Sequence, residues 1–272
     1  MTERDDLLNA ADRLLTDVTT FMSTAPVLDT ELEQKIALGL TARVLKLAHA
    51  VHRLCVADCA VDAEPVARAM LSGAASLIFM LDYDVKRRAA LFLIEGQKQE
   101  KRRFERLKRN GMLTKERLGQ HIRESNATLE QTLASHNLRD VNRNKYDAEK
   151  TWHGLSDRVV FELMGWSDWY DMYAAFSANI HVSASSLSEV VSEIEARSID
   201  ITRSGGDPYL VIIAMNIAVP QVLFQLEKLF SWGKHDEIEA IGTRLAAAIS
   251  TYASAQLRRD SLGHPAQRDL RR

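Results

Sequence analysis

The chain has 272 residues, of which 46% are hydrophobic and 26% charged, and its formal net charge is −2. This length allows a large buried core, and the near-neutral charge excludes a global field that would draw the molecule to nucleic acid or anionic membranes. Only 12 glycines and 5 prolines are present, which favours helices over turn-rich sheets.

The first two predicted helices are amphipathic. Apolar residues at three- and four-residue spacings mark residues 3–22, and a second helix follows a cap at Asp29 and runs to about Cys59. Cys55 and Cys59 are four residues apart on this helix, where side chains share a face but a disulfide fits poorly. We therefore expect two reduced, partly buried thiols.

A third helix is predicted for residues 64–81, with Pro65 in its first turn. Beyond Arg68 this helix is nearly all small and apolar, which allows a neighbouring helix to approach closely. Arg68 is the single charge in that stretch, so we expect it to meet a partner or to face a polar cleft.

A long basic helix is predicted between Lys86 and Arg109, with Gly111 as its C-terminal cap. It contains ten Lys or Arg and three acids. One interpretation is a surface for phosphate groups, with RNA as the partner, and the alternative is a solvated face with internal ion pairs. The residues assigned to the phosphate surface are Lys98, Lys101, Arg102, Arg103, Arg106 and Arg109.

Three further helices are predicted before residue 200. Thr114 caps an exposed helix, and a polar loop over residues 135–150 follows it. Ser156 caps a short helix, and Ser167 caps a longer one that runs to about Arg197.

The most apolar helix lies in the C-terminal part, where Asp207 provides its cap and Pro220 is expected to kink it. Its apolar run, residues 209–224, is shorter than the ~20 residues needed to span a bilayer. We therefore expect a buried core helix and no membrane segment. A last helix is predicted for residues 236–259.

Together these elements predict an all-α fold, a single helical-bundle domain of about eight or nine helices over residues 1–260 with a polar tail at 261–272. The N-terminus lacks the basic and apolar regions of a signal peptide, which predicts a cytoplasmic location. No cofactor or metal is expected, because the chain contains no P-loop, no Gly-x-Ser-x-Gly and no His-Glu-x-x-His motif.

Side chains with polar tips gather between Trp152 and Leu187, a stretch that holds three of the four tryptophans. Ser177 and His181 are four residues apart and share a helix face, the arrangement of a serine–histidine pair. The alternative is structural, with Ser177 bonded to the backbone and His181 in the core.

A spaced motif runs through the same stretch. It consists of Trp152-His153-Gly154, Ser156, Arg158, Gly165, Tyr170, Tyr173, Ser177 and His181-Val182-Ser183. This motif resembles a bacterial domain-of-unknown-function family, number five-six-seven-seven, over about residues 35–195. Members also carry an arginine followed four residues later by a glutamate, and here Arg68 matches while Ser72 stands at the glutamate position. The resemblance implies an all-helical intracellular protein with a polar cluster of Arg68, Trp152, Arg158, Tyr170, Tyr173 and His181.

Three functions are compatible with these features. The first is a helical interaction or scaffold module, not an enzyme, that forms a homo-oligomer or binds a protein partner. The second is a HEPN-like, metal-independent ribonuclease or toxin in phage defence, with His181 as acid/base and Arg158 or Arg68 binding phosphate. The third is a small-molecule-binding protein whose aromatic pocket contains Trp152, Tyr170 and Tyr173, with Ser177 beside them.

Overall fold

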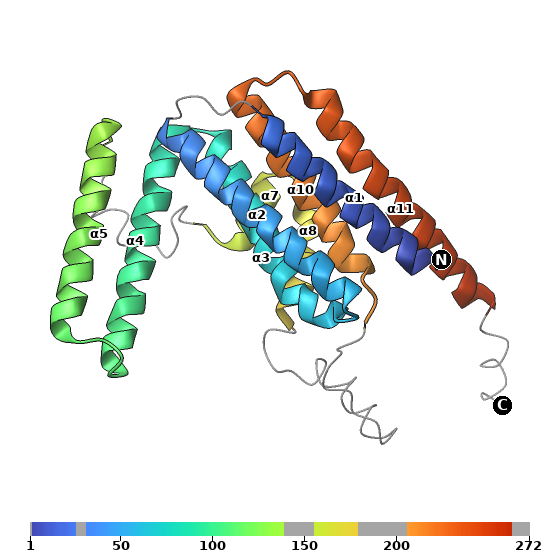
Figure 1. Ribbon diagram of the computed structural model, residues 1–272, viewed down its shortest axis with the longest axis horizontal. Coiled ribbons are helices and arrows are strands. Elements are labelled where there is room, and N and C mark those ends of the chain that lie inside the picture. Colours follow the sequence, from blue (N-terminus) through green and yellow to red (C-terminus); the bar gives the residue numbers. More distant parts are fainter. Residues whose placement is uncertain (1, 26–30, 139–154, 179–205, 263–272) are drawn as a thin grey trace.

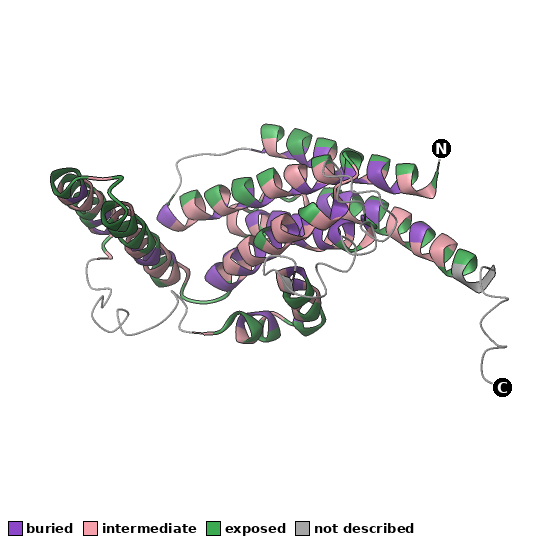
Figure 2. Cartoon of the chain, turned by 90° about the horizontal axis from the view of Figure 1, so that it is seen from below, coloured by how far each residue is buried: buried purple, intermediate pink, exposed green. Residues whose placement is uncertain are grey.

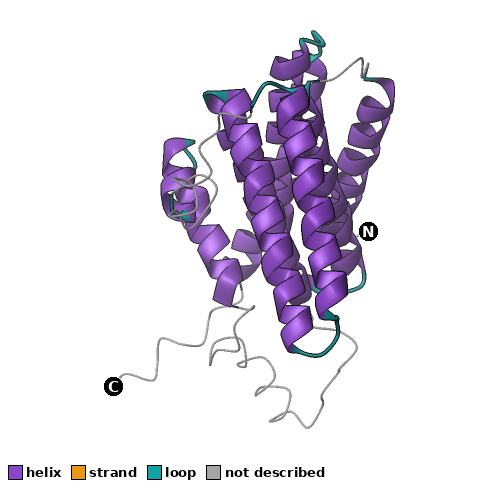
Figure 3. Cartoon of the chain, turned by 90° about the vertical axis from the view of Figure 1, so that its left-hand side faces the viewer, coloured by secondary structure: helices purple, strands orange, loops and turns teal. Residues whose placement is uncertain are grey.

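The computed structural model describes residues 2–25, 31–138, 155–178 and 206–262, and within these residues it contains nine α-helices and no strand (Figures 1 and 3). The all-α prediction is confirmed. The helices are α1 (Glu3–Thr24), α2 (Leu32–Val56), α3 (Ala60–Asp82), α4 (Val85–Arg109), α5 (Lys115–Ser135), α7 (Asp157–Leu163), α8 (Ser167–Ala178), α10 (Tyr209–Phe230) and α11 (His235–Leu262).

Helix α10 lies at the centre of the bundle, where it packs against α2, α3 and α11. Its side chains are apolar around most of the circumference, and Ile212, Met215 and Leu223 are fully buried. A helix with neighbours on several sides needs such a composition, because most of its residues are buried or partly buried, although Leu210 near its start is 48% exposed. Helix α1 packs against α2 and α11, and Figure 2 shows the buried residues on the inner faces of these helices.

Small residues bring α3 close to α2. Ala67 and Ala74 are fully buried, and a Cβ atom on Gly73 would lie 3.1 Å from Cγ2 of Val44. Both α3 and α10 are long and apolar enough to cross a membrane by length and composition alone. Core helices pass the same test, and these two helices form the interior of the bundle.

Several predicted helix ends are confirmed by their hydrogen bonds. The hydroxyl of Thr114 accepts a bond from the Arg117 N–H at 3.3 Å, and that of Ser156 accepts one from the Val159 N–H at 3.4 Å. Gly111 follows α4 with a φ of 72°, a left-handed conformation that glycine adopts without steric cost.

Three helix starts differ from the prediction. Helix α8 already includes Ser167 as its first residue, so Ser167 does not cap it. Glu31 caps α2 in place of Asp29, which lies outside the described residues, because Glu31 forms a reciprocal capping box with the glutamine three residues later. Helix α3 begins at Ala60, so Pro65 lies inside the helix and not in its first turn. The helical turn that precedes Pro65 is stabilised by the burial of Ala60 and Ala63 in the core.

Helices α4 and α5 form a hairpin at one edge of the bundle (Figure 1). The first half of α4 is anchored to the body, since Ala89, Ala90 and Ile94 are buried. From Gly96 to Arg109 every α4 residue is at least partly exposed. The distal part of the hairpin therefore presents much of its surface to solvent, as the outer faces in Figure 2 show.

Candidate functional site

Arg68, Tyr173 and Asp157 form a polar network that joins α3, α8 and α7. The Arg68 guanidinium donates a hydrogen bond to the Tyr173 hydroxyl oxygen at 3.0 Å and lies 4.6 Å from the centroid of the tyrosine ring. The same hydroxyl donates to Oδ2 of Asp157 at 2.6 Å. Tyr173 is only 5% exposed, whereas Arg68 is partly buried and Asp157 is exposed, so the network runs from the protein interior to its surface.

Burial and the hydrogen bond to the Asp157 carboxylate both raise the pKa of Tyr173 above its usual value. The hydroxyl is therefore neutral at physiological pH and acts as a hydrogen-bond bridge between a cation and a carboxylate. The Nε atom of Arg68 is buried and has no partner among the described residues.

An aromatic cluster surrounds this network. Phe161 is 1% exposed, and its ring centroid lies 5.1 Å from that of Tyr173 and 5.9 Å from that of Tyr170. The Tyr170 and Tyr173 centroids are themselves 5.9 Å apart. The two tyrosines that were assigned to an aromatic pocket thus pack on Phe161, while Trp152 lies outside the described residues.

The other predicted site residues have separate positions. Arg158 is exposed and donates from Nε to Oε1 of Glu162 at 2.8 Å, one turn along its own helix. The Ser177 hydroxyl donates to the Tyr173 carbonyl oxygen at 3.2 Å, which is the backbone bond of the structural alternative. His181 lies outside the described residues. The structure therefore brings together Arg68, Tyr170 and Tyr173, and it pairs Arg158 with Glu162.

Asp157 is the member of the network that sequence reasoning missed. It follows the Ser156 cap directly, and an acid in the first turn of a helix is explained by the helix dipole. Its second role depends on how α7 packs against α8, and the local sequence contains no signal of that contact.

The basic helix presents arginines on one side. Arg102, Arg106 and Arg109 are exposed and, with Gln99 and Glu105, line a surface hollow of about 440 Å³. Spacings of four and three residues place the three arginines on a common helix face. They form a continuous cationic row, which we call the arginine row.

Positive charge is concentrated around the arginine row. Residues 101–117 contain eight Lys or Arg and two Glu, in a chain whose total charge is −2. Lys101 and Arg103 are exposed, whereas Lys98 is partly buried. The distal end of the hairpin is therefore strongly cationic, although the whole chain is slightly acidic.

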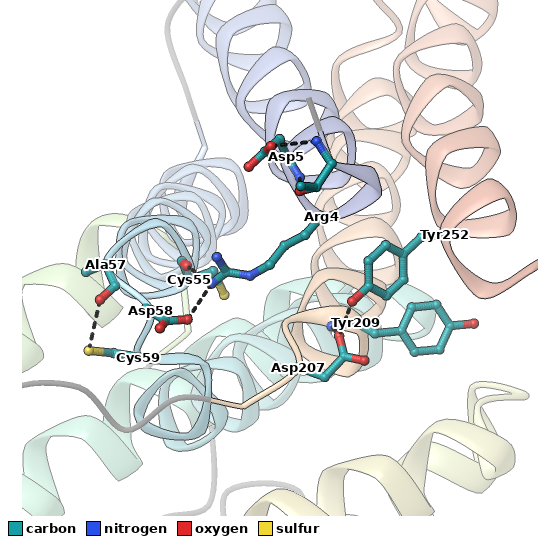
Figure 4. Close-up of polar contacts among 10 residues, drawn as sticks. Arg4, Asp5, Cys55, Ala57, Asp58, Cys59, Asp207, Tyr209 and Tyr252 are labelled. Atoms are coloured by element: carbon teal, nitrogen blue, oxygen red, sulfur yellow. Dashed lines mark hydrogen bonds and ion pairs between the residues drawn. The ribbon is translucent and has the colours of Figure 1, made fainter. Parts of the chain in front are cut away.

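Neither cysteine forms a disulfide, as expected. Cys55 is fully buried, and this burial raises the pKa of its thiol to about 12. The Cys59 sulfur lies 3.5 Å from the Ala57 carbonyl oxygen. Beside them Arg4 donates to the Cys55 carbonyl oxygen at 3.0 Å and to Asp58 at 2.8 Å, which ties α1 to the end of α2 (Figure 4).

A sequence profile of a family of unknown function, DUF5677, matches residues 34–197, more than half of the chain. The chain belongs to the DUF5677 family. The family suspected from the sequence motif is thereby confirmed. The DUF5677 region includes the Arg68–Tyr173 pair and the whole α4–α5 hairpin. No curated protein and no solved structure matches the chain.

Proposed function

We propose that this DUF5677 member is a helical interaction module that binds RNA through the arginine row of α4. The observation that carries the proposal is that the side chains of Arg102, Arg106 and Arg109 are exposed, and none of them has a hydrogen bond or ion pair with another described residue. Arginine is well suited to phosphate, because its planar guanidinium can donate two parallel hydrogen bonds.

The spacing of the arginine row supports an extended anionic partner. Like charges three and four residues apart repel one another along a helix, and a bound polyanion would relieve that repulsion. The seven residue steps from Arg102 to Arg109 correspond to about 10 Å of helix. This length accommodates several backbone charges of a nucleic acid but exceeds a single phosphate group.

The surrounding side chains favour recognition of the RNA backbone over recognition of bases. Phe104 is the aromatic residue of this half of α4, and its ring is stacked on His121 with centroids 4.6 Å apart and an interplanar angle of 2°. It is therefore engaged within the hairpin. Phosphate contacts alone give low sequence selectivity and a steep dependence on salt.

The proposal is tested by fluorescence anisotropy with a short fluorescein-labelled single-stranded RNA. Replacing Arg102, Arg106 and Arg109 together by alanine should weaken binding by about five- to a hundredfold, since three lost phosphate contacts at roughly 0.3–1 kcal/mol each sum to about 1–3 kcal/mol. Equal affinity of the wild type and this variant would overturn the proposal.

The matched control removes the same charge elsewhere. Arg13 on α1 and Arg43 and Lys46 on α2 are also exposed and have no recorded side-chain partner among the described residues. Their triple alanine variant should bind RNA like the wild type. A similar loss in both variants would show that net charge, and not the arginine row, determines affinity.

Self-association and a cytoplasmic location are further parts of this proposal. The packing of α10 against α2, α3 and α11 supports the location, because most of its apolar side chains are at least partly covered by these helices. Sedimentation equilibrium measures the oligomeric state, and a monomer at all concentrations would remove self-association. Gel analysis of the incubated RNA distinguishes binding from the alternative ribonuclease, whose cleavage should disappear in His181→Ala.

A further inference from the structure

A solvent-open cavity of about 680 Å³ lies between the α4–α5 hairpin and the start of α2. Ile36, Phe92 and Leu93 contribute apolar surface to it, and Leu129 of α5 does so from the opposite side. This volume falls within the range of small-molecule sites, which is roughly 300–1,000 Å³. None of these residues belongs to the arginine row, so the cavity is a separate feature of the hairpin.

Two carboxylates line the same cavity, one from each helix of the hairpin. Glu100 of α4 accepts a hydrogen bond from the Ser125 hydroxyl at 3.1 Å, and Glu124 of α5 accepts one from the Gln120 amide at 2.8 Å. The nearest ring nitrogen, Nδ1 of His121, is 4.0 Å from the Glu124 carboxylate. Both carboxylates therefore retain acceptor capacity toward the cavity, since each can accept several hydrogen bonds.

We propose that the cavity binds an amphipathic organic amine. Its ammonium group is paired by Glu100 and Glu124, and its apolar body lies against Phe92 and Leu93. Lys35 is the one lysine or arginine among the residues that line the cavity, so the lining as a whole favours a cation over an anion. The apolar wall supplies affinity through burial, and the two carboxylates select the charge of the ligand.

Dansylcadaverine is a suitable probe, because it combines an aromatic body with a primary amine and becomes brighter in apolar surroundings. We expect a saturable increase in emission on titration with the full-length protein. The comparison probe is 1-anilinonaphthalene-8-sulfonate, which has a similar aromatic body but a negative charge. Tighter or equal binding of the anionic probe would overturn the proposal.

The charge selection is tested by the double variant Glu100→Gln and Glu124→Gln. It should bind dansylcadaverine about five- to tenfold more weakly, because two exposed charge pairs are lost. The matched control is Glu105→Gln with Glu116→Gln, which removes the same charge from the same hairpin outside the cavity lining. An equal effect of both double variants would contradict a specific role of Glu100 and Glu124.

The position of the ligand is tested by Gly96→Leu. Gly96 lines the cavity, and a Cβ atom added there meets nothing within 4 Å, so a leucine at this position starts in open space and should take up part of the cavity. Helix α4 should remain folded, because leucine favours a helix more than glycine does. Gly39→Leu is the control, since Gly39 is also open but lies outside the lining.

We expect Gly96→Leu to abolish dansylcadaverine binding and Gly39→Leu to leave it unchanged. Binding that persists in Gly96→Leu would place the probe elsewhere and overturn the proposal. RNA binding in both variants should equal that of the wild type, so this inference and the proposed function can fail independently.

Discussion

The guanidinium of Arg68 lies over the ring of Tyr173 and also donates a hydrogen bond to that residue's hydroxyl oxygen. The two residues are 105 positions apart along the chain, and the guanidinium contacts both the π face of the tyrosine ring and its hydroxyl group. The Tyr173 hydroxyl in turn donates a hydrogen bond to the Asp157 carboxylate. This relationship ties α3 to both short helices of the second half of the DUF5677 region.

Removing the Tyr173 hydroxyl should destabilise the folded protein. Tyr173→Phe leaves an Arg68 N–H and the Asp157 carboxylate without their partner, and we expect a loss of about 1–2 kcal/mol in the free energy of unfolding. Urea denaturation measures this change. Tyr170→Phe is the control, because no hydrogen bond of the Tyr170 hydroxyl is recorded among the described residues, and it should change stability by less than about 0.5 kcal/mol.

The contribution of Tyr173 should depend on pH. Its pKa is raised in the folded state above the usual tyrosine value of about 10, chiefly by burial and then by the hydrogen bond to the Asp157 carboxylate. The folded protein therefore keeps this proton where the unfolded chain loses it, and the stabilisation is present below pH 10 and is lost as the pH rises further. The stability difference between wild type and Tyr173→Phe should shrink above pH 10, and a difference that grows would contradict this.

The two thiols should react at different rates. Because the pKa of Cys55 is about 12, only about one molecule in ten thousand carries its thiolate at pH 8. Iodoacetamide should modify a single cysteine in the native protein, and Cys59→Ser should remove that reaction. Mass spectrometry counts the adducts. Two adducts in the native protein would show that Cys55 is accessible.

Two glycines should respond oppositely to alanine. Gly206 has a φ of 88°, and a Cβ atom there would lie 2.8 Å from Cγ2 of Val61, so Gly206→Ala should destabilise by about 1–3 kcal/mol. Gly39 lies within α2 in open space, and Gly39→Ala should stabilise by about 0.5–1 kcal/mol. Thermal unfolding of both variants checks the signs, and a stabilising Gly206→Ala would contradict the packing described.

Periodicity and capping chemistry predicted much of the fold. Thr114 and Ser156 cap the helices that their residue types indicated, because a hydroxyl cap depends only on the next three residues. The start of α3 could not be predicted in the same way. Pro65 is compatible with a first helical turn, and only the burial of Ala60 against other helices extends α3 beyond it.

The polar network was predictable in part. Arg68 and Tyr173 stood out because a charge in an apolar helix and a tyrosine beside apolar neighbours both need a partner. Asp157 did not, since its position in the first turn of α7 explains it locally. Arg158 has a local partner in Glu162, and an i to i+4 pair on an exposed face carries no information about a distant site.

The salt dependence of RNA binding tests the central claim most directly. The logarithm of the binding constant falls with the logarithm of the salt concentration, with a slope of about −0.7 for each phosphate contact to a single strand. Loss of Arg102, Arg106 and Arg109 should therefore lower the magnitude of the slope by about 2 relative to the wild type. The Arg13, Arg43 and Lys46 variant should keep the wild-type slope. Identical slopes for wild type and the arginine-row variant would contradict the account.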